Sequence, residues 1–216
     1  MANITAAMVQ ELRQITGAGM VECKKALTEC EGDMEKAKDL LRKKGLATAN
    51  KKAGRIAAEG QVHAYIHGGG RVGVLLEVNI ETDFAARTED FKSLVHEIAL
   101  HICASSPTYV TREEVPQAVI DRENEIYAEQ LRNEGKPEKA WPKIMEGKLN
   151  KFFSEACLMD QPYAFETKIT IKDMVNNVTA KIGEKISVRR FVRWELGEGL
   201  EKRVYDLAKE VAAEMK

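Results

Sequence analysis

The sequence has few of the features that mark secreted, membrane-bound or strongly charged proteins. Its 216 residues include four cysteines and five prolines. Cysteines this few and this widely spaced suit neither a disulfide scaffold nor a paired metal site in a chain of this length. The formal net charge is −1, so the chain lacks the positive field that draws proteins to nucleic acids or anionic membranes.

Long apolar stretches are also missing. No segment approaches the roughly 20 apolar residues that a membrane-spanning helix needs. The start of the chain, Met1-Ala2-Asn3-Ile4, lacks the basic region and apolar segment of a secretion signal. We therefore expect a globular cytoplasmic protein of one to two domains, with no membrane and no nucleic acid among its partners.

Groups for catalytic chemistry are scarce. Ser105 and Ser106 lie near His101 in the sequence, and a nucleophile with its base is one interpretation. No nucleophile-elbow motif surrounds these serines, however, and they are typical of a helix end. His96 and His101 are five residues apart on a predicted helix and therefore face different ways. We expect no enzymatic activity, no cofactor and no metal site.

Three short amphipathic helices are predicted at the N-terminus. Thr5 caps the first helix, Gly17 ends it, and the third starts at Asp33 and ends at Gly45. The expected core of the first helix comprises Met8, Val9, Leu12 and Ile15. The Gly17-Ala18-Gly19 link resembles part of a dinucleotide-binding fingerprint, but it follows a helix and has no third glycine, which favours a helix–helix turn. Residues 47–58 are predicted to form a linker helix.

Beyond residue 58 the pattern changes to strands. Residues 61–67 and 71–80 surround three consecutive glycines, which predicts a β-hairpin because glycine accepts the positive φ of such turns. A phosphate-binding loop is the alternative, although such a loop should lead into a helix. In the second strand one face carries Val72, Val74, Leu76, Val78 and Ile80. In a later strand one face is expected to carry Ile186, Val188, Arg190, Val192 and Trp194.

Helices are predicted between and after these strands. Thr88 caps a helix with an apolar stripe that ends before Pro107. Residues 111–114 match a capping box for a helix that runs to about Asn133. This helix pairs as a hairpin with one that has Pro142 in its first turn, and residues 200–215 form the last helix. The fold class is therefore α+β, with a three-helix N-terminal bundle, a core of antiparallel sheet with packed helices, and a helical hairpin.

The most informative motif, Glu81-Thr82-Asp83-Phe84, lies where the second strand ends. Phe84 keeps the alternation of the strand only if the strand continues, whereas residues 85–90 are typical of a turn into a helix. An aromatic side chain at this position usually packs beneath the following helix. Phe84 therefore either fills the core or protrudes toward a partner. Met20 is equally ambiguous, because it suits a bundle core as well as an adaptable contact surface.

Several separated motifs together resemble the bacterial elongation factor Ts family. They are residues 12–27, Gly45, residues 51–55, residues 81–84, residues 101–105 and residues 197–199, in the order of the family. The resemblance covers essentially the whole chain. It implies a ubiquitin-associated-like helical domain with a basic linker over residues 1–55 and an α+β core domain over residues 56–216.

The resemblance also implies a function and a set of contact residues. Members of the family are guanine-nucleotide exchange factors that bind elongation factor Tu with GDP and release the GDP by displacing magnesium, so that GTP can rebind. The residues implied in magnesium displacement are Thr82, Asp83, Phe84 and Ala85. Those implied in partner binding are Arg13, Met20, Val21, His101, Tyr163 and Phe165. Val21 stands where a second methionine is common in the family.

The chain is similar to the short form of the family. Longer members carry two related core subdomains and a coiled-coil insertion, whereas this chain has material for about one core. Short forms imply a homodimer, or a complex of two factors with two GTPases. A competing interpretation is an RNA-associated adaptor that uses a basic cluster as a phosphate-binding edge. That cluster comprises Lys43, Lys44, Lys51, Lys52 and Arg55.

Overall fold

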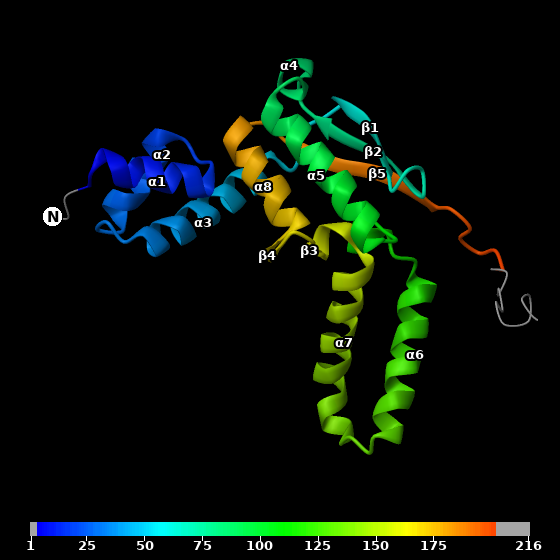
Figure 1. Cartoon of the computed structure of the whole chain (residues 1–216). Helices are drawn as coiled ribbons and strands as arrows, with labels where there is room; N and C mark the ends of the chain where they lie inside the picture. The colour runs from blue at the N-terminus through cyan, green and yellow to red at the C-terminus, as the bar shows by residue number, and fades with distance from the viewer. Residues whose placement is uncertain (1–3, 202–216) are drawn as a thin grey trace, which may run out of the picture.

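The computed structural model of the protein describes residues 4–201 and confirms the α+β class. Figure 1 shows three N-terminal helices beside a central sheet with helices, from which a helical hairpin extends. The helices are α1 (Ala6–Thr16), α2 (Met20–Glu29), α3 (Met34–Lys52), α4 (Asp83–Ala86), α5 (Glu89–Ser105), α6 (Gln117–Asn133), α7 (Trp141–Ala156) and α8 (Ile171–Ile182). The strands are β1 (Glu59–His67), β2 (Val72–Ile80), β3 (Pro162–Tyr163), β4 (Glu166–Thr170) and β5 (Ile186–Glu195).

Helices α1 to α3 form a bundle with its own buried core. The bundle core comprises Val9, Leu12, Cys23, Ala26, Leu27, Ala37 and Leu41. The predicted caps at Thr5 and Gly17 are confirmed. Ile15 was expected in this core, but its side chain is 56 % exposed. It lies in the last turn of α1, next to the glycine link.

The third helix does not end at Gly45 as predicted, but continues to Lys52. Gly45 is buried in the helix, and a Cβ atom placed on it would lie 3.6 Å from the Cβ of Ala180 in α8. Gly45 therefore lies at the contact between α3 and α8, and this tertiary packing outweighs the weak helix propensity of glycine. Residues 53–58, expected as part of a linker helix, are not helical.

A three-stranded antiparallel sheet in the order β1-β2-β5 forms the centre of the core. The predicted β1–β2 hairpin is confirmed, and its three glycines all have positive φ. The predicted buried face of β2 is also confirmed, and it packs under α5, which in turn contacts α8. Gly60 is required at its position in β1, because its φ is 137° and a Cβ atom there would lie 2.1 Å from the carbonyl oxygen of Val78.

The predicted alternation of β5 fails after Val188. Arg190 lies opposite Glu77 and Val188 lies opposite Val78, so Arg189 is an extra residue that forms a β-bulge. The bulge reverses the two faces of the rest of the strand. Phe191 consequently packs against the core, whereas Val192 and Trp194 are exposed on the outer face of the sheet.

Helices α6 and α7 form the predicted hairpin. Pro142 lies in the first turn of α7 as expected. The predicted capping box at residues 111–114 is wrong, because α6 begins only after Pro116. Val115, the residue before this proline, has an extended backbone. The carboxylate of Glu114 instead accepts from the backbone N–H of Val110. The predicted last helix, residues 200–215, falls almost entirely outside the described residues.

Candidate partner-binding surface

Phe84 protrudes from the end of the sheet. Strand β2 ends at Ile80, and α4 follows as a single helical turn that places Phe84 at its exposed side. The Phe84 side chain is 79 % exposed, whereas that of Ala85 is 3 % exposed. Ala85 thus anchors the turn in the core, and Phe84 points away from it. The alternative in which Phe84 fills the core is wrong for this structure.

The core position beneath the next helix is occupied by another aromatic residue. Thr88 caps α5 by accepting from the backbone N–H of Phe91 at 3.4 Å. Phe91 is fully buried against the sheet. Phe91 therefore fills the core beneath α5, whereas the ring of Phe84 is exposed and available to another molecule.

The base of the α4 turn is tied to the loop between α8 and β5. The backbone N–H of Thr82 donates to Glu184 Oε2 at 2.9 Å, and its hydroxyl donates to Glu184 Oε1 at 2.8 Å. In the opposite direction, the backbone N–H of Lys185 donates to Glu81 Oε1 at 2.6 Å. This bond, with a contribution from Arg55, lowers the pKa of Glu81. At the outer side of the turn, Arg87 and Asp83 form an ion pair at 2.8 Å.

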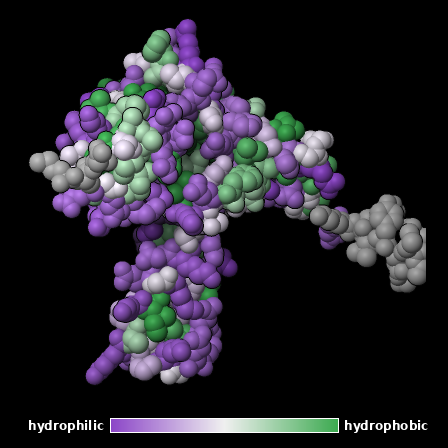
Figure 2. Space-filling view, turned by 60° about the vertical axis from the view of Figure 1, so that its left-hand side comes forward, coloured by the Kyte–Doolittle hydropathy of each residue, from purple (hydrophilic) through white to green (hydrophobic). Residues whose placement is uncertain are grey.

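A second group of exposed residues flanks the turn between α1 and α2. Arg13 is exposed, and the side chains of Met20 and Val21 are 45 % and 65 % exposed. Ile15 adds an exposed apolar side chain that the sequence had assigned to the core. Gly17 ends α1 with φ 67°, so the chain reverses sharply between these residues. Figure 2 shows hydrophobic areas on an otherwise mostly hydrophilic surface rather than one continuous field.

His101 does not lie on the surface. Its side chain is fully buried, which corrects the expectation of a direct partner contact. Nε2 donates to Gln161 Oε1 at 2.8 Å, and Nδ1 accepts from the backbone N–H of Ala164 at 3.2 Å. His101 therefore holds the turn between β3 and β4. Of the predicted residues in that turn, Tyr163 is half-buried and Phe165 is 65 % exposed.

The burial of His101 makes the stability of the protein depend on pH. Burial lowers the pKa of His101 below its ordinary value of 6.5, and the hydrogen bond to Gln161 opposes this only in part. Below about pH 6.5 the unfolded chain therefore binds a proton that the folded chain does not bind, so stability is complete above that pH and falls as the pH drops toward the folded pKa. We expect the melting temperature to drop by a few degrees more in the native chain than in His101→Gln between pH 7.5 and 5.5.

Calorimetry of both proteins at the two pH values provides the measurement. Burial also lowers the pKa of His63, so both proteins retain one pH-dependent contribution of the same sign. The comparison isolates His101 for that reason. Equal drops in the two proteins would contradict the prediction.

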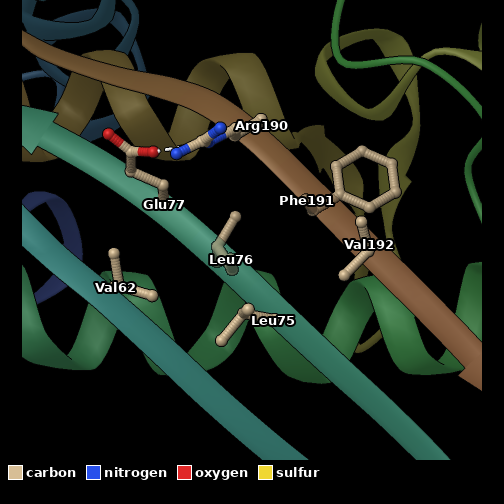
Figure 3. Close-up of a pocket in the computed structure, with 7 residues that line it drawn as sticks. All are labelled: Val62, Leu75, Leu76, Glu77, Arg190, Phe191 and Val192. Carbon is tan, nitrogen blue, oxygen red and sulfur yellow. Dashed lines mark hydrogen bonds and ion pairs between the residues drawn. The ribbon is translucent and has the colours of Figure 1, made fainter.

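The outer face of the sheet is a third exposed apolar surface. Its exposed side chains are Val62, Ile66, Leu75, Val192 and Trp194. A hollow of about 300 Å³ opens here. Figure 3 shows Val62, Leu75 and Val192 on three neighbouring strands, with the Glu77–Arg190 pair beside them. We refer to the five exposed apolar side chains, Val62, Ile66, Leu75, Val192 and Trp194, as the outer sheet face. The bulge at Arg189, which the sequence did not reveal, brings Val192 and Trp194 into it.

The basic cluster is partly engaged in contacts within the protein. Lys44 pairs with Glu29, Lys52 donates to the backbone oxygen of Gly183, and Arg55 pairs with Glu81. These contacts are structural, which weakens the case for a free phosphate-binding edge. Over residues 4–201 no helix is long and apolar enough to cross a membrane. Within the same residues no group of three or more histidine, cysteine or acidic side chains is placed to hold a metal ion.

The fold and the exposed residues define a class of protein. It is a helical bundle joined to an α+β core, with exposed apolar side chains on the α4 turn, beside the turn between α1 and α2, and on the outer sheet face. Comparison with known proteins specifies this class further. The family described as Elongation factor TS matches residues 5–198. A protein named Elongation factor Ts from Desulforamulus reducens is 58 % identical over 100 % of this chain and 100 % of its own. One of the same name from Carboxydothermus hydrogenoformans is 60 % identical over 99 % of this chain and 98 % of its own.

A third relative of the same name, from Heliobacterium modesticaldum, is 59 % identical over 98 % of this chain and 99 % of its own. The chain therefore belongs to the elongation factor Ts family, and it is a translation elongation factor. The resemblance that the sequence motifs carried is confirmed.

Proposed function

We propose that the chain is a guanine-nucleotide exchange factor that binds elongation factor Tu with GDP in the cytoplasm and promotes the release of GDP. The observation that carries the proposal is the exposed ring of Phe84 on a turn whose base is fixed to the core. An exposed aromatic side chain on a rigid support loses little conformational entropy on binding. The family resemblance supports the identity of the partner.

In the proposed mechanism, the free energy gained by burying an apolar side chain drives the displacement of magnesium. GDP is held in the GTPase partly through its phosphates and a magnesium ion that offsets their charge. Phe84 enters an apolar crevice of the GTPase, and burial of its ring contributes roughly 1.5–3 kcal/mol. This gain offsets the cost of moving the segments that bind magnesium and phosphate. Asp83 presents a carboxylate beside the ring, and its negative charge repels the phosphates of GDP.

The other contact residues hold the two proteins together. Residues 1–55 act as one docking unit through Arg13, Met20 and Val21, and residues 56–216 act as the other through Tyr163 and Phe165. Because the coupling between two ligands is reciprocal, GDP weakens binding of the factor as much as the factor weakens binding of GDP. The factor therefore accelerates exchange without being consumed.

A direct test measures nucleotide release. Elongation factor Tu loaded with a fluorescent GDP is mixed with excess unlabelled GDP, with and without the factor, in a stopped-flow instrument. The proposal requires substoichiometric factor to accelerate release for many turnovers. Release at the spontaneous rate over a wide range of factor concentrations would refute the exchange function.

We propose further that two copies of the chain associate through the outer sheet face, and that the dimer binds two GTPases. Five exposed apolar side chains from three strands make this face suited to a second copy of itself across a two-fold axis. Leu75 lies on the central strand of the face. Its position makes it the most sensitive site for a test.

We expect Leu75→Glu to convert a dimer into a monomer, because each of the two copies would place a charge in the apolar contact. Sedimentation equilibrium at micromolar concentration measures the mass. Ile126→Glu on the helical hairpin, which alters an isoleucine that is also exposed, serves as the control and leaves the dimer intact. A native chain that sediments as a monomer, or a Leu75→Glu dimer, would contradict this assignment.

A further inference from the structure

The turn that presents Phe84 is too short to hold its own shape. Helix α4 has four residues, Asp83–Ala86, and an isolated helix of one turn is unstable because nucleation costs more than its hydrogen bonds return. Its geometry must therefore be imposed from outside. One constraint is the burial of Ala85, and another is the Asp83–Arg87 pair, whose two side chains are 65 % and 78 % exposed. Exposed pairs of this kind contribute little.

A third constraint comes from a residue 102 positions away in the sequence. The carboxylate of Glu184 accepts two hydrogen bonds from Thr82, one from its backbone N–H and one from its hydroxyl. The Thr82 hydroxyl oxygen in turn accepts from the backbone N–H of Ala85 at 3.2 Å, as the N-cap of α4. Because the hydroxyl proton is directed to Glu184, the oxygen lone pair is left for Ala85. The three groups form a chain from Ala85 through Thr82 to a charged acceptor, and such chains strengthen each of their bonds.

Glu184 is itself held in place. It follows Gly183, which ends α8 with φ 83°, and it is half-buried between α8 and β5. The next residue, Lys185, donates its backbone N–H to Glu81 and its Nζ to the backbone oxygen of Arg55. The two segments thus exchange hydrogen bonds at successive residues, and Figure 1 shows the end of α8 at the end of the core that carries α4. The turn is therefore supported by the segment between α8 and β5.

We infer that Glu184 is a positioning residue for nucleotide exchange, which fixes the orientation of Phe84 through Thr82. The inference rests on the proposed role of Phe84 and adds a residue that acts on the ring through Thr82. The inference separates the affinity of the factor for the GTPase from the maximal rate of GDP release. Affinity depends on the exposed contacts, whereas the maximal rate of GDP release depends on how often Phe84 is oriented to enter the partner.

The first experiment measures the turn in the free protein. Hydrogen exchange of the Ala85 amide is followed by NMR in the native chain and in Glu184→Ala. We expect the exchange of this amide to become roughly tenfold faster, as loss of a hydrogen bond to a charged group implies. The amide of Phe91, which is bonded to Thr88, provides an internal control and stays unchanged. An unchanged Ala85 amide overturns the inference without any reference to the partner.

The second experiment measures GDP release at saturating factor. Glu184→Ala is expected to lower the maximal rate roughly tenfold, with less than a twofold change in the concentration of factor that gives half-maximal rate. Glu184→Gln keeps one acceptor oxygen and recovers part of the rate. Glu134→Ala, which removes an exposed carboxylate at the far end of the hairpin, leaves the rate unchanged. Melting temperatures close to that of the native chain show that the variants are folded. If Glu184→Ala does not fold, the rate of Glu184→Gln is compared with that of the native chain instead.

A double-mutant cycle separates positioning from other effects. Thr82→Ala removes the hydroxyl bond to Glu184 and keeps the backbone N–H bond. If Glu184 acts through Thr82, the Thr82→Ala/Glu184→Ala chain therefore loses less rate than the product of the two single losses. Additive losses overturn the inference. A normal rate for Glu184→Ala beside a slow Phe84→Ala overturns it while the proposed function stands. A normal rate for Phe84→Ala overturns the role of Phe84 and, with it, this inference.

Discussion

Replacing Phe84 by alanine is expected to lower the maximal rate of GDP release from the GTPase roughly 10- to 100-fold. The side chain is 79 % exposed in the free protein, so most of its apolar surface is available for burial against the partner. Loss of roughly 1.5–3 kcal/mol of burial raises the barrier of the step that displaces magnesium, and about 1.4 kcal/mol corresponds to a tenfold change in rate. Stopped-flow release of fluorescent GDP at saturating factor is the measurement.

Two further variants make this result specific. Phe84→Leu keeps an apolar side chain of similar reach and is expected to retain a large part of the rate. Ile126→Ala removes apolar surface from the hairpin and is expected to have no effect on release. The folded state of Phe84→Ala should be unaffected, because an exposed side chain contributes little to the core. A native rate for the alanine variant would remove Phe84 from the mechanism.

The parts of the fold that follow from local rules were predictable. The caps at Thr5 and Thr88, the glycine turn of the hairpin and the buried face of β2 all appear as expected. Each is decided by residues within a few positions along the chain, so the sequence pattern carries the information. Apolar periodicity likewise predicted α5, whose stripe is buried against the sheet.

Other features depend on residues that meet only in the folded chain. Gly45 looked like a helix end, but it is a contact with Ala180, 135 positions away. The bulge at Arg189 leaves no trace in the pattern, because an exposed arginine at either position of the Arg189-Arg190 pair is equally acceptable. It nevertheless decides which face Val192 and Trp194 occupy. Both features depend on contacts between residues far apart in the sequence, and the apolar periodicity of a single segment does not reveal such contacts.

The candidate site shows the same division. The position of the Thr82-Asp83-Phe84 segment at a strand end was predictable, but the exposure of Phe84 was not, because the strand pattern does not decide whether the ring packs beneath the following helix. The burial of His101 had a signal that was available in the sequence. His101 is three residues after Ile98 and seven after Leu94, which places it on the same apolar stripe of α5. A histidine on such a stripe faces the core.

The largest expected effect on affinity lies at the other end of the molecule. The Met20→Asp/Val21→Asp double variant is expected to raise the factor concentration for half-maximal GDP release about a hundredfold. Both side chains are exposed, so the bundle should remain folded, and each loses an apolar contact and gains a charge that must be desolvated in the complex. The maximal rate should change by less than threefold, because Phe84 is intact. Titration of the factor in the stopped-flow assay measures both quantities.

The double variant and Phe84→Ala therefore act on different parameters. One weakens binding and leaves the maximal rate, whereas the other lowers the maximal rate and leaves most of the binding. The Met20→Leu/Val21→Ile chain keeps the apolar character of both positions and serves as the matched control, with a half-maximal concentration close to that of the native chain. If the aspartate variant instead lowered the maximal rate at native affinity, the N-terminal helices would take part in the displacement of magnesium. Docking by residues 1–55 and nucleotide release by the core would then no longer be separate functions.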